Sequence, residues 1–218
     1  MSDATREGAA QHPALAHHFE DLDQQRGASE LGMWAFLVTE IMFFGGLFTT
    51  YAVYKFAYPQ AFHDASHHLD IRLGGFNTVV LIASSLTMVL AVQAAQTGQR
   101  ARQRLYLWLT IFLGLVFLGV KSVEYHHKWI EHLIPGPTFA PTDRGSALFY
   151  SLYFGMTGMH ALHMIIGIGL LLYLVVRAGR GHFSAEYHTP VEVVGLYWHF
   201  VDIVWIFLFP LLYLLGRH

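Results

Sequence analysis

The sequence predicts an all-α integral membrane protein, built as a bundle of five transmembrane helices. Hydrophobic residues make up 54% of the 218-residue chain, and charged residues make up only 13%. Soluble domains usually carry about a quarter charged residues. Five long apolar stretches reach or approach the roughly 20 residues that a helix needs to cross about 30 Å of hydrocarbon. We expect these spans at about residues 31–54, 73–95, 105–123, 147–176 and 191–215, all within a membrane domain of residues 30–218.

Composition excludes several other classes of protein. The chain has no cysteine, so it can form no disulfide, iron–sulfur cluster or thiolate-ligated heme. Its formal net charge is −2 and it has no long basic run, so nucleic acid is not expected as a partner. A transmembrane barrel would show alternating strands of about ten residues, and the chain shows continuous apolar runs instead.

Residues 1–29 are polar and precede the first span. They lack the basic flank, apolar run and cleavage site of a secretory signal. We expect a cytoplasmic tail that is mobile or lies on the surface. Three of its histidines could bind a metal, although a solvated tail is the favoured interpretation. These are His12, His17 and His18.

Residues that begin or end helices separate the five spans. Proline and glycine interrupt helices, and an acid in the first turn favours a helix start. The signals are Pro59 after the first span, Gly98 after the second, Pro135, Gly136, Pro137 and Pro141 between the third and fourth, and Thr189, Pro190 and Glu192 at the fifth.

The basic residues predict the orientation. Five spans put the two termini on opposite sides of the membrane. The N-terminal side would hold Arg6, Arg26, Arg100, Arg102, Arg104, Arg177 and Arg180. The other side would hold Lys55, Arg72, Lys128, Arg144 and Arg217. Because cytoplasmic loops carry an excess of basic residues, we expect a cytoplasmic N-terminus and an external C-terminus.

Glu40 is the only charged residue inside the first span. An ionisable group in hydrocarbon costs roughly 2.5–3.5 kcal/mol on insertion scales, and it normally faces protein or water. Desolvation favours the neutral form of a carboxyl group, so we expect a buried protonatable acid. Such an acid could handle protons, face lipid or simply hold two helices together.

Four more polar residues lie near the middle of the last two spans. His160 and His163 are three residues apart, as are His199 and Asp202, so each pair shares a helix face. The pattern allows a metal site, a heme ligated by histidines, or an interhelical polar network that fixes helix register. The residues alone favour the network, because no further carboxylates complete a two-metal set.

Lys121 and Glu124 have the same spacing at the outer end of the third span. We expect them to form a salt bridge near the membrane interface. Glycines within the spans allow close helix packing, with a lipid or gas passage as the alternative. They are Gly45, Gly46, Gly155, Gly158, Gly167 and Gly169.

The ordered sequence motifs resemble subunit III of the heme–copper terminal oxidases, over about residues 30–215. The matching segments are 36–44 (FLVTEIMFF), 76–78 (FNT), 84–85 (SS), 124–125 (EY), 149–150 (FY), 157–163 (TGMHALH) and 197–205 (YWHFVDIVW). The chain departs from the family pattern at Lys121, where glutamine is frequent, and at Met159 and Ala161. Longer members have seven helices, and this chain begins at what looks like the third.

The resemblance implies a five-helix subunit of a cytochrome c oxidase type complex, in the inner (plasma) membrane of a bacterium. Heme and copper would belong to subunits I and II, with no metal and no catalytic residue in this chain. The subunit would flank subunit I, bind phospholipid and support proton uptake. Glu40 would be the family's buried carboxyl group. His160, His163, His199 and Asp202 would be structural or would contact lipid.

Alternatives within and outside the family stay open at this stage. Quinol oxidases and proteins associated with nitric-oxide reductases have similar five-helix subunits. Outside the family, the chain could be an independent membrane enzyme with a histidine-ligated metal or heme. It could also be a transporter that uses Glu40 as its coupling site.

Overall fold

The computed structural model describes residues 15–136, 139 and 143–215, and over these ranges the fold consists of helices without strands. Five helical segments are long and apolar enough to cross a membrane, which confirms the predicted fold class. The elements are α1 (Leu22–Ala57), α2 (Pro59–His67), α3 (Ile71–Gln96), α4 (Arg100–Ile130), α5 (Arg144–Gly179), α6 (Thr189–Phe209) and the π-helical turn η1 (Pro210–Leu214).

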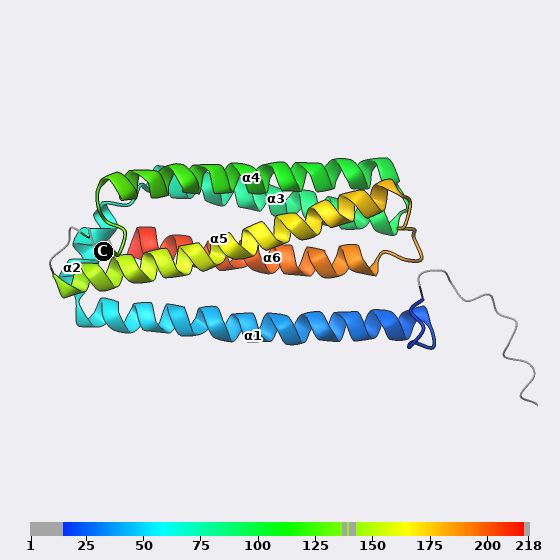
Figure 1. Ribbon diagram of the computed structural model, residues 1–218, viewed down its shortest axis with the longest axis horizontal. Coiled ribbons are helices and arrows are strands. Elements are labelled where there is room, and N and C mark those ends of the chain that lie inside the picture. Colours follow the sequence, from blue (N-terminus) through cyan, green and yellow to red (C-terminus); the bar gives the residue numbers. More distant parts are fainter. Residues whose placement is uncertain (1–14, 137–138, 140–142, 216–218) are drawn as a thin grey trace, which may run out of the picture.

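The five long helices run along one axis, with α1 on the outside of the bundle (Figure 1). α3 and α4 form a closely packed hairpin, and α6 packs against α1, α3 and α5. The most apolar part of the α6 segment has 56% of its residues buried, whereas that of α1 has 11%. α6 is therefore the centre of the bundle, and most of α1 is left for lipid or another protein chain.

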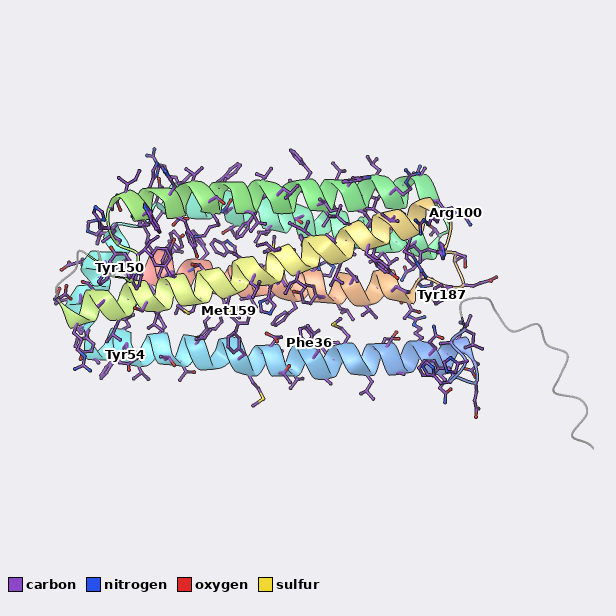
Figure 2. The ribbon with its side chains drawn as sticks, viewed as in Figure 1. Phe36, Tyr54, Arg100, Tyr150, Met159 and Tyr187 are labelled. Atoms are coloured by element: carbon purple, nitrogen blue, oxygen red, sulfur yellow. The ribbon has the colours of Figure 1, made fainter. Side chains whose placement is uncertain are left out.

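Many large apolar side chains point outward, as expected where lipid replaces water as the solvent. Side chains of α1 also reach toward the rest of the bundle, where the Phe36 ring lies 6.0 Å from the Tyr197 ring (Figure 2). The most exposed of the outward residues include Leu31, Met42, Val79, Leu86, Phe112, Trp129 and Phe207.

The indole ring of Trp198 joins α6 to three other helices. Its Nε1–H donates a hydrogen bond to Ser84 Oγ in α3 at 3.0 Å. A methyl group added at Gly114 in α4 or at Gly167 in α5 would lie 2.9 Å from the same ring. These two glycines therefore let the helices close on the tryptophan. Gly169, by contrast, has open space beside it.

The helices extend beyond the predicted spans. α1 begins at Leu22, and the Asp21 carboxylate accepts a hydrogen bond from the Gln24 N–H at its start. At α5 the Ser146 N–H donates to Asp143, and this bond lowers the pKa of the Asp143 carboxyl below its ordinary value. Part of the predicted tail is thus helical, while Arg6 and His12 lie outside the described residues. A search for long apolar stretches does not detect the polar residues at the ends of helices.

The loops agree with several boundary signals and differ at others. Gly98 has φ +69°, a left-handed conformation that suits glycine in the tight turn between α3 and α4. Thr189 is the first residue of α6, and His188 occupies the cap position, where its side chain contacts Glu192 at 3.2 Å but makes no capping hydrogen bond to the backbone. Pro137, Pro141 and Arg217 lie outside the described residues.

A short helix, α2, was not predicted. Pro59 does end the first span, but it also starts this second helix. The buried Phe62 anchors α2 because its ring packs on Tyr51 at 5.3 Å and on Phe149 at 5.4 Å. α2 therefore lies against the start of α5, at the same end of the bundle as η1 (Figure 1).

Candidate functional site

Glu40 contacts a histidine of another helix. Its Oε2 in α1 lies 3.2 Å from Nε2 of His163 in α5, and the two side chains are 19% and 10% exposed. The other ring nitrogen of His163, Nδ1, lies 2.8 Å from the Met159 carbonyl oxygen, so it must carry the hydrogen that it donates. The Glu40–His163 contact therefore requires one further proton, held on either the carboxyl group or the imidazole.

Aromatic groups enclose this pair. The Phe44 ring lies 5.5 Å from the His163 ring, and the Tyr197 hydroxyl donates to the His163 carbonyl oxygen at 2.9 Å. Water is a poor competitor in such surroundings, so the interaction between acid and imidazole is stronger than at a wet surface. The arrangement can hold and exchange a proton close to the lipid-facing helix α1.

His160 lies one turn from His163 but points into the bundle. It is 1% exposed, and neither of its ring nitrogens makes a hydrogen bond to the described residues. The ring packs against Phe117 at 5.4 Å and Trp205 at 5.3 Å. His160 is thus part of an aromatic cluster between α4, α5 and α6.

His199 and Asp202 face the α3 side of α6. His199 Nδ1 lies 2.7 Å from Ser85 Oγ, whereas neither Asp202 oxygen is hydrogen-bonded within the part of the chain that the structure describes. His199, Asp202 and Ser85 line a cavity of about 370 Å³. The structure therefore brings His163 to Glu40 and His199 to Ser85, rather than joining the four residues in one site.

Lys121 and Glu124 form the expected salt bridge, at 2.9 Å, but protein side chains enclose it. The two residues are 4% and 3% exposed, because Tyr153 of α5 and Tyr213 of η1 cover them. Lys121 donates to the hydroxyls of Tyr153 (3.2 Å) and Tyr213 (3.0 Å). Both tyrosines donate in turn to Glu124 Oε1.

Aromatic rings complete the surroundings of the Lys121 ammonium. Four ring centroids lie between 5.1 and 5.7 Å from its nitrogen, a range that favours cation–π attraction. Sequence analysis missed Tyr153 and Tyr213 as members of this cluster. They come from other elements of the chain, and spacing along one helix cannot reveal them.

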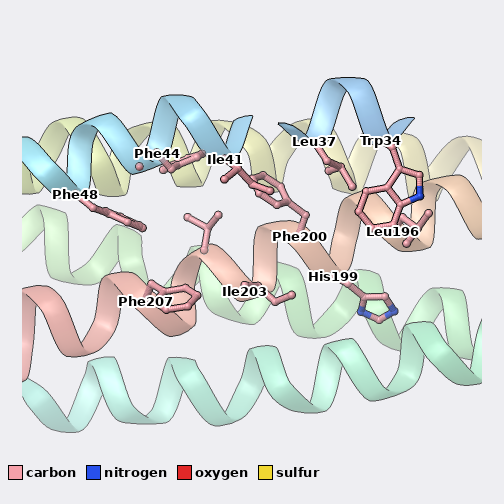
Figure 3. Close-up of a pocket in the computed structure, with 12 residues that line it drawn as sticks. Trp34, Leu37, Ile41, Phe44, Phe48, Leu196, His199, Phe200, Ile203 and Phe207 are labelled. Atoms are coloured by element: carbon pink, nitrogen blue, oxygen red, sulfur yellow. The ribbon is translucent and has the colours of Figure 1, made fainter. Parts of the chain in front are cut away.

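An apolar cavity of about 480 Å³ separates α1 from α6. Figure 3 shows side chains of α1, such as Phe44 and Phe48, facing Phe207 of α6 across it. Gly45 is also part of the lining. This shape and chemistry suit a hydrocarbon chain.

The apolar cavity continues into a polar region at the N-terminal end of α1. A second cavity of about 600 Å³ shares Trp34, Leu196 and His199 with the first. Charges of both signs line it, with Arg26 Nη2 lying 3.1 Å from Glu192 Oε2. Together the two cavities have the polarity of a phospholipid, with an apolar slot and a charged end.

These features define a class of protein: a helical membrane protein that buries ionisable side chains inside its bundle, with Glu40 of α1 in contact with His163 of α5. Within the described residues, no three His, Asp or Glu side chains are arranged to hold a metal ion. A family model for cytochrome c oxidase subunit III matches residues 11–217. The chain belongs to this family. Such membership fits a chain that carries no cofactor, and it implies a complex with other oxidase subunits.

Individual relatives agree with this assignment. A cytochrome c oxidase subunit 3 from Synechocystis sp. is 37% identical over 185 residues, covering 84% of this chain and 74% of the relative. The cytochrome c oxidase subunit 3 from Corynebacterium diphtheriae is 35% identical, and the match covers 84% of this chain and 86% of the relative. A cytochrome bo(3) ubiquinol oxidase subunit 3 from Pseudomonas aeruginosa is 29% identical, and the match covers 93% of this chain and 92% of the relative.

The buried Lys121–Glu124 pair leads to a prediction about stability. Lys121→Met or Glu124→Gln alone should destabilise the bundle by about 3–5 kcal/mol, because each leaves a buried charge without its partner. The double variant should lose clearly less than the sum of the two losses. Reversible denaturation of the detergent-solubilised chain would measure the three free energies.

Glu30 provides an exposed control for this cycle. It pairs with Arg26 at i, i+4 spacing on α1, at 2.7 Å, and the Arg26 and Glu30 side chains are 46% and 41% exposed. Glu30→Gln should change stability by about 1 kcal/mol or less. Additive losses at Lys121 and Glu124 would show that the buried pair has no special role in stability.

Proposed function

We propose that the chain is a flanking subunit of an aerobic terminal oxidase that has no redox chemistry of its own. Subunits I and II would carry the heme and copper, and this chain would stabilise subunit I, hold phospholipid and support proton uptake. The observation that carries this proposal is the 3.2 Å contact between the Glu40 carboxyl and the His163 imidazole, on the least buried of the five candidate spans of a subunit III bundle. No residue of the chain is assigned a catalytic role.

Proton support follows from the position of Glu40. The acid lies in the middle of α1, whose side chains mostly face away from the bundle. A proton held between Glu40 and His163 is therefore close to whatever covers α1. We place subunit I near this surface, so that the pair can buffer protons while the complex reduces oxygen.

Lipid binding follows from the joined cavities between α1 and α6. We propose that one acyl chain lies in the apolar slot and that a zwitterionic head group lies in the second cavity, beside the Arg26–Glu192 ion pair. Its phosphate would approach the Arg26 guanidinium and its ammonium the Glu192 carboxylate, so that both charges have a partner of opposite sign. His199, which lines both cavities, would lie beside the lipid.

The proposed setting is the inner membrane of a bacterium, with the N-terminal tail in the cytoplasm. Arg100 lies at the end of the bundle where α1 begins (Figure 2). Arg26 near the start of α1 and Arg177 in the last turn of α5 belong to helix ends on the same side (Figure 1), in agreement with an excess of cytoplasmic basic residues. The relatives named cytochrome c oxidase at 35–37% identity favour cytochrome c as the electron donor. The relative named ubiquinol oxidase keeps a quinol donor as the second candidate.

Glu40→Gln in the intact complex tests the proton role. The variant keeps the size of the side chain but cannot ionise, so initial oxygen consumption should stay close to wild type. Proton pumping should fall, or activity should be lost several times faster during continuous turnover. Oxygen electrode traces and pH measurements on reconstituted vesicles would report both quantities.

Thr39→Ala is the control for this experiment, since Thr39 is the neighbouring residue and its hydroxyl donates a hydrogen bond to the carbonyl of Phe36 in its own helix. It should behave as wild type in every assay. If Glu40→Gln also matches wild type in activity, pumping and endurance, Glu40 serves packing alone.

Filling the apolar cavity tests the lipid proposal. Gly45 lines the slot and has open space beside it, so Gly45→Leu should occupy the volume of an acyl chain. Native mass spectrometry should then show one phospholipid fewer per complex than in wild type. Gly46→Leu is the matched control, because Gly46 has equally open surroundings but does not line the slot. Equal lipid retention in both variants would contradict the assignment.

A further inference from the structure

α2 carries a pair of histidines that the oxidase assignment does not use. His63 and His67 are four residues apart, so they lie on the same face of this helix. Their Nε2 atoms are 3.4 Å apart, and their ring centroids are 4.6 Å apart. The same spacing places the two zinc-binding histidines of a helix on one face in metalloprotease motifs.

The distance between the nitrogens fits a shared metal ion. Imidazole nitrogens bind zinc at about 2.0–2.1 Å, and zinc prefers tetrahedral geometry. Two nitrogens at that distance from a tetrahedral ion lie about 3.3 Å from each other. The separation in α2 is already close to this value, so the pair needs little movement to bind.

Asp64 prepares one of the rings for metal binding. Its carboxylate oxygen Oδ1 lies 3.3 Å from Nδ1 of His63. Nδ1 of a neutral ring carries the hydrogen in such a contact, which leaves the lone pair on Nε2, the atom that faces His67. A carboxylate that orients a histidine in this way is common around zinc sites.

The backbone that carries the pair is firmly held. Phe62, Ala65 and Ser66 are buried against the bundle, and the Ser66 hydroxyl donates to the His63 carbonyl oxygen at 2.7 Å. At the end of α2, Lys128 Nζ donates to the His68 carbonyl oxygen at 2.8 Å. His63 and Asp64 themselves remain open to solvent, with side chains 43% and 76% exposed.

We propose that His63 and His67 bind one zinc ion at the end of the bundle formed by α2 and η1. The two Nε2 atoms are the protein ligands, Asp64 orients His63, and water fills the remaining positions. Across the part of the chain that the structure describes, no third His, Asp or Glu side chain completes the set. The site is therefore a binding site without the enclosed four-ligand shell of a structural zinc.

Zinc titration of the full chain in detergent tests this assignment, with a chromophoric chelator as competitor. Wild type should show one site that His63→Ala or His67→Ala weakens by about tenfold or more. Asp64→Asn should weaken it by a smaller factor. His182→Ala is the matched control, because His182 is an exposed histidine in the loop before α6, and it should leave the affinity unchanged.

Two further measurements keep the result unambiguous. X-ray absorption of the zinc-loaded chain should show two imidazole nitrogens in the first coordination shell, and circular dichroism should show that the variants stay helical. A His17→Ala/His18→Ala variant tests the N-terminal tail as the source of binding. The proposal is overturned if zinc affinity is the same in wild type and His67→Ala, or if binding is lost only with the tail histidines.

Discussion

The structure depends on one constraint: a polar side chain within hydrocarbon is costly unless the protein pairs it or encloses it. The chain meets this constraint partly by contacts between different helices and partly by enclosure, as at His160, which packs against aromatic side chains. Glu40 and His163 join α1 to α5, and His199 and Ser85 join α6 to α3. Because each contact works at only one register of its two helices, these pairs fix how the helices lie against one another.

The same constraint explains why α6 and α4 carry most of the buried hydrogen bonds described above. Trp198 and Trp205 of α6 are fully buried, and each indole donates a hydrogen bond to α3, to Ser84 and to Thr78. The Lys121 ammonium in α4 is surrounded by tyrosine hydroxyls and aromatic rings. These contacts hold α3, α5 and η1 against α4 and α6.

The sequence predicted the five spans and their order well, because apolar length is a local property of the chain. It predicted the helix ends poorly. α1 starts at Leu22, where the residues are polar but still helical, and α2 lies in a stretch without an apolar run. Its nine residues form a helix because Phe62 is buried against Tyr51 and Phe149. Such a contact between distant segments leaves no periodic signal.

The same difference between local signals and contacts of distant segments applies to the candidate site. Spacing placed His160 and His163 on one face of a helix, but it could not say what lies opposite each ring. His163 contacts the Glu40 carboxyl, whereas the His160 ring packs against Phe117 and Trp205. For Lys121, the partner Glu124 was visible at i, i+3 spacing. The covering residue Tyr213 of η1 was not, because it is 92 residues away in the sequence and approaches Lys121 only in the folded bundle.

The central claim is that this chain belongs to an oxidase and carries no electron carrier itself. The most direct test is gentle purification of the chain from its native membrane, followed by a visible spectrum, metal analysis and identification of the accompanying proteins. Heme and copper should be found on larger companion subunits, and the separated chain should be colourless. A purified chain without companions that carries its own stoichiometric heme, lost in His160→Ala, would contradict this account.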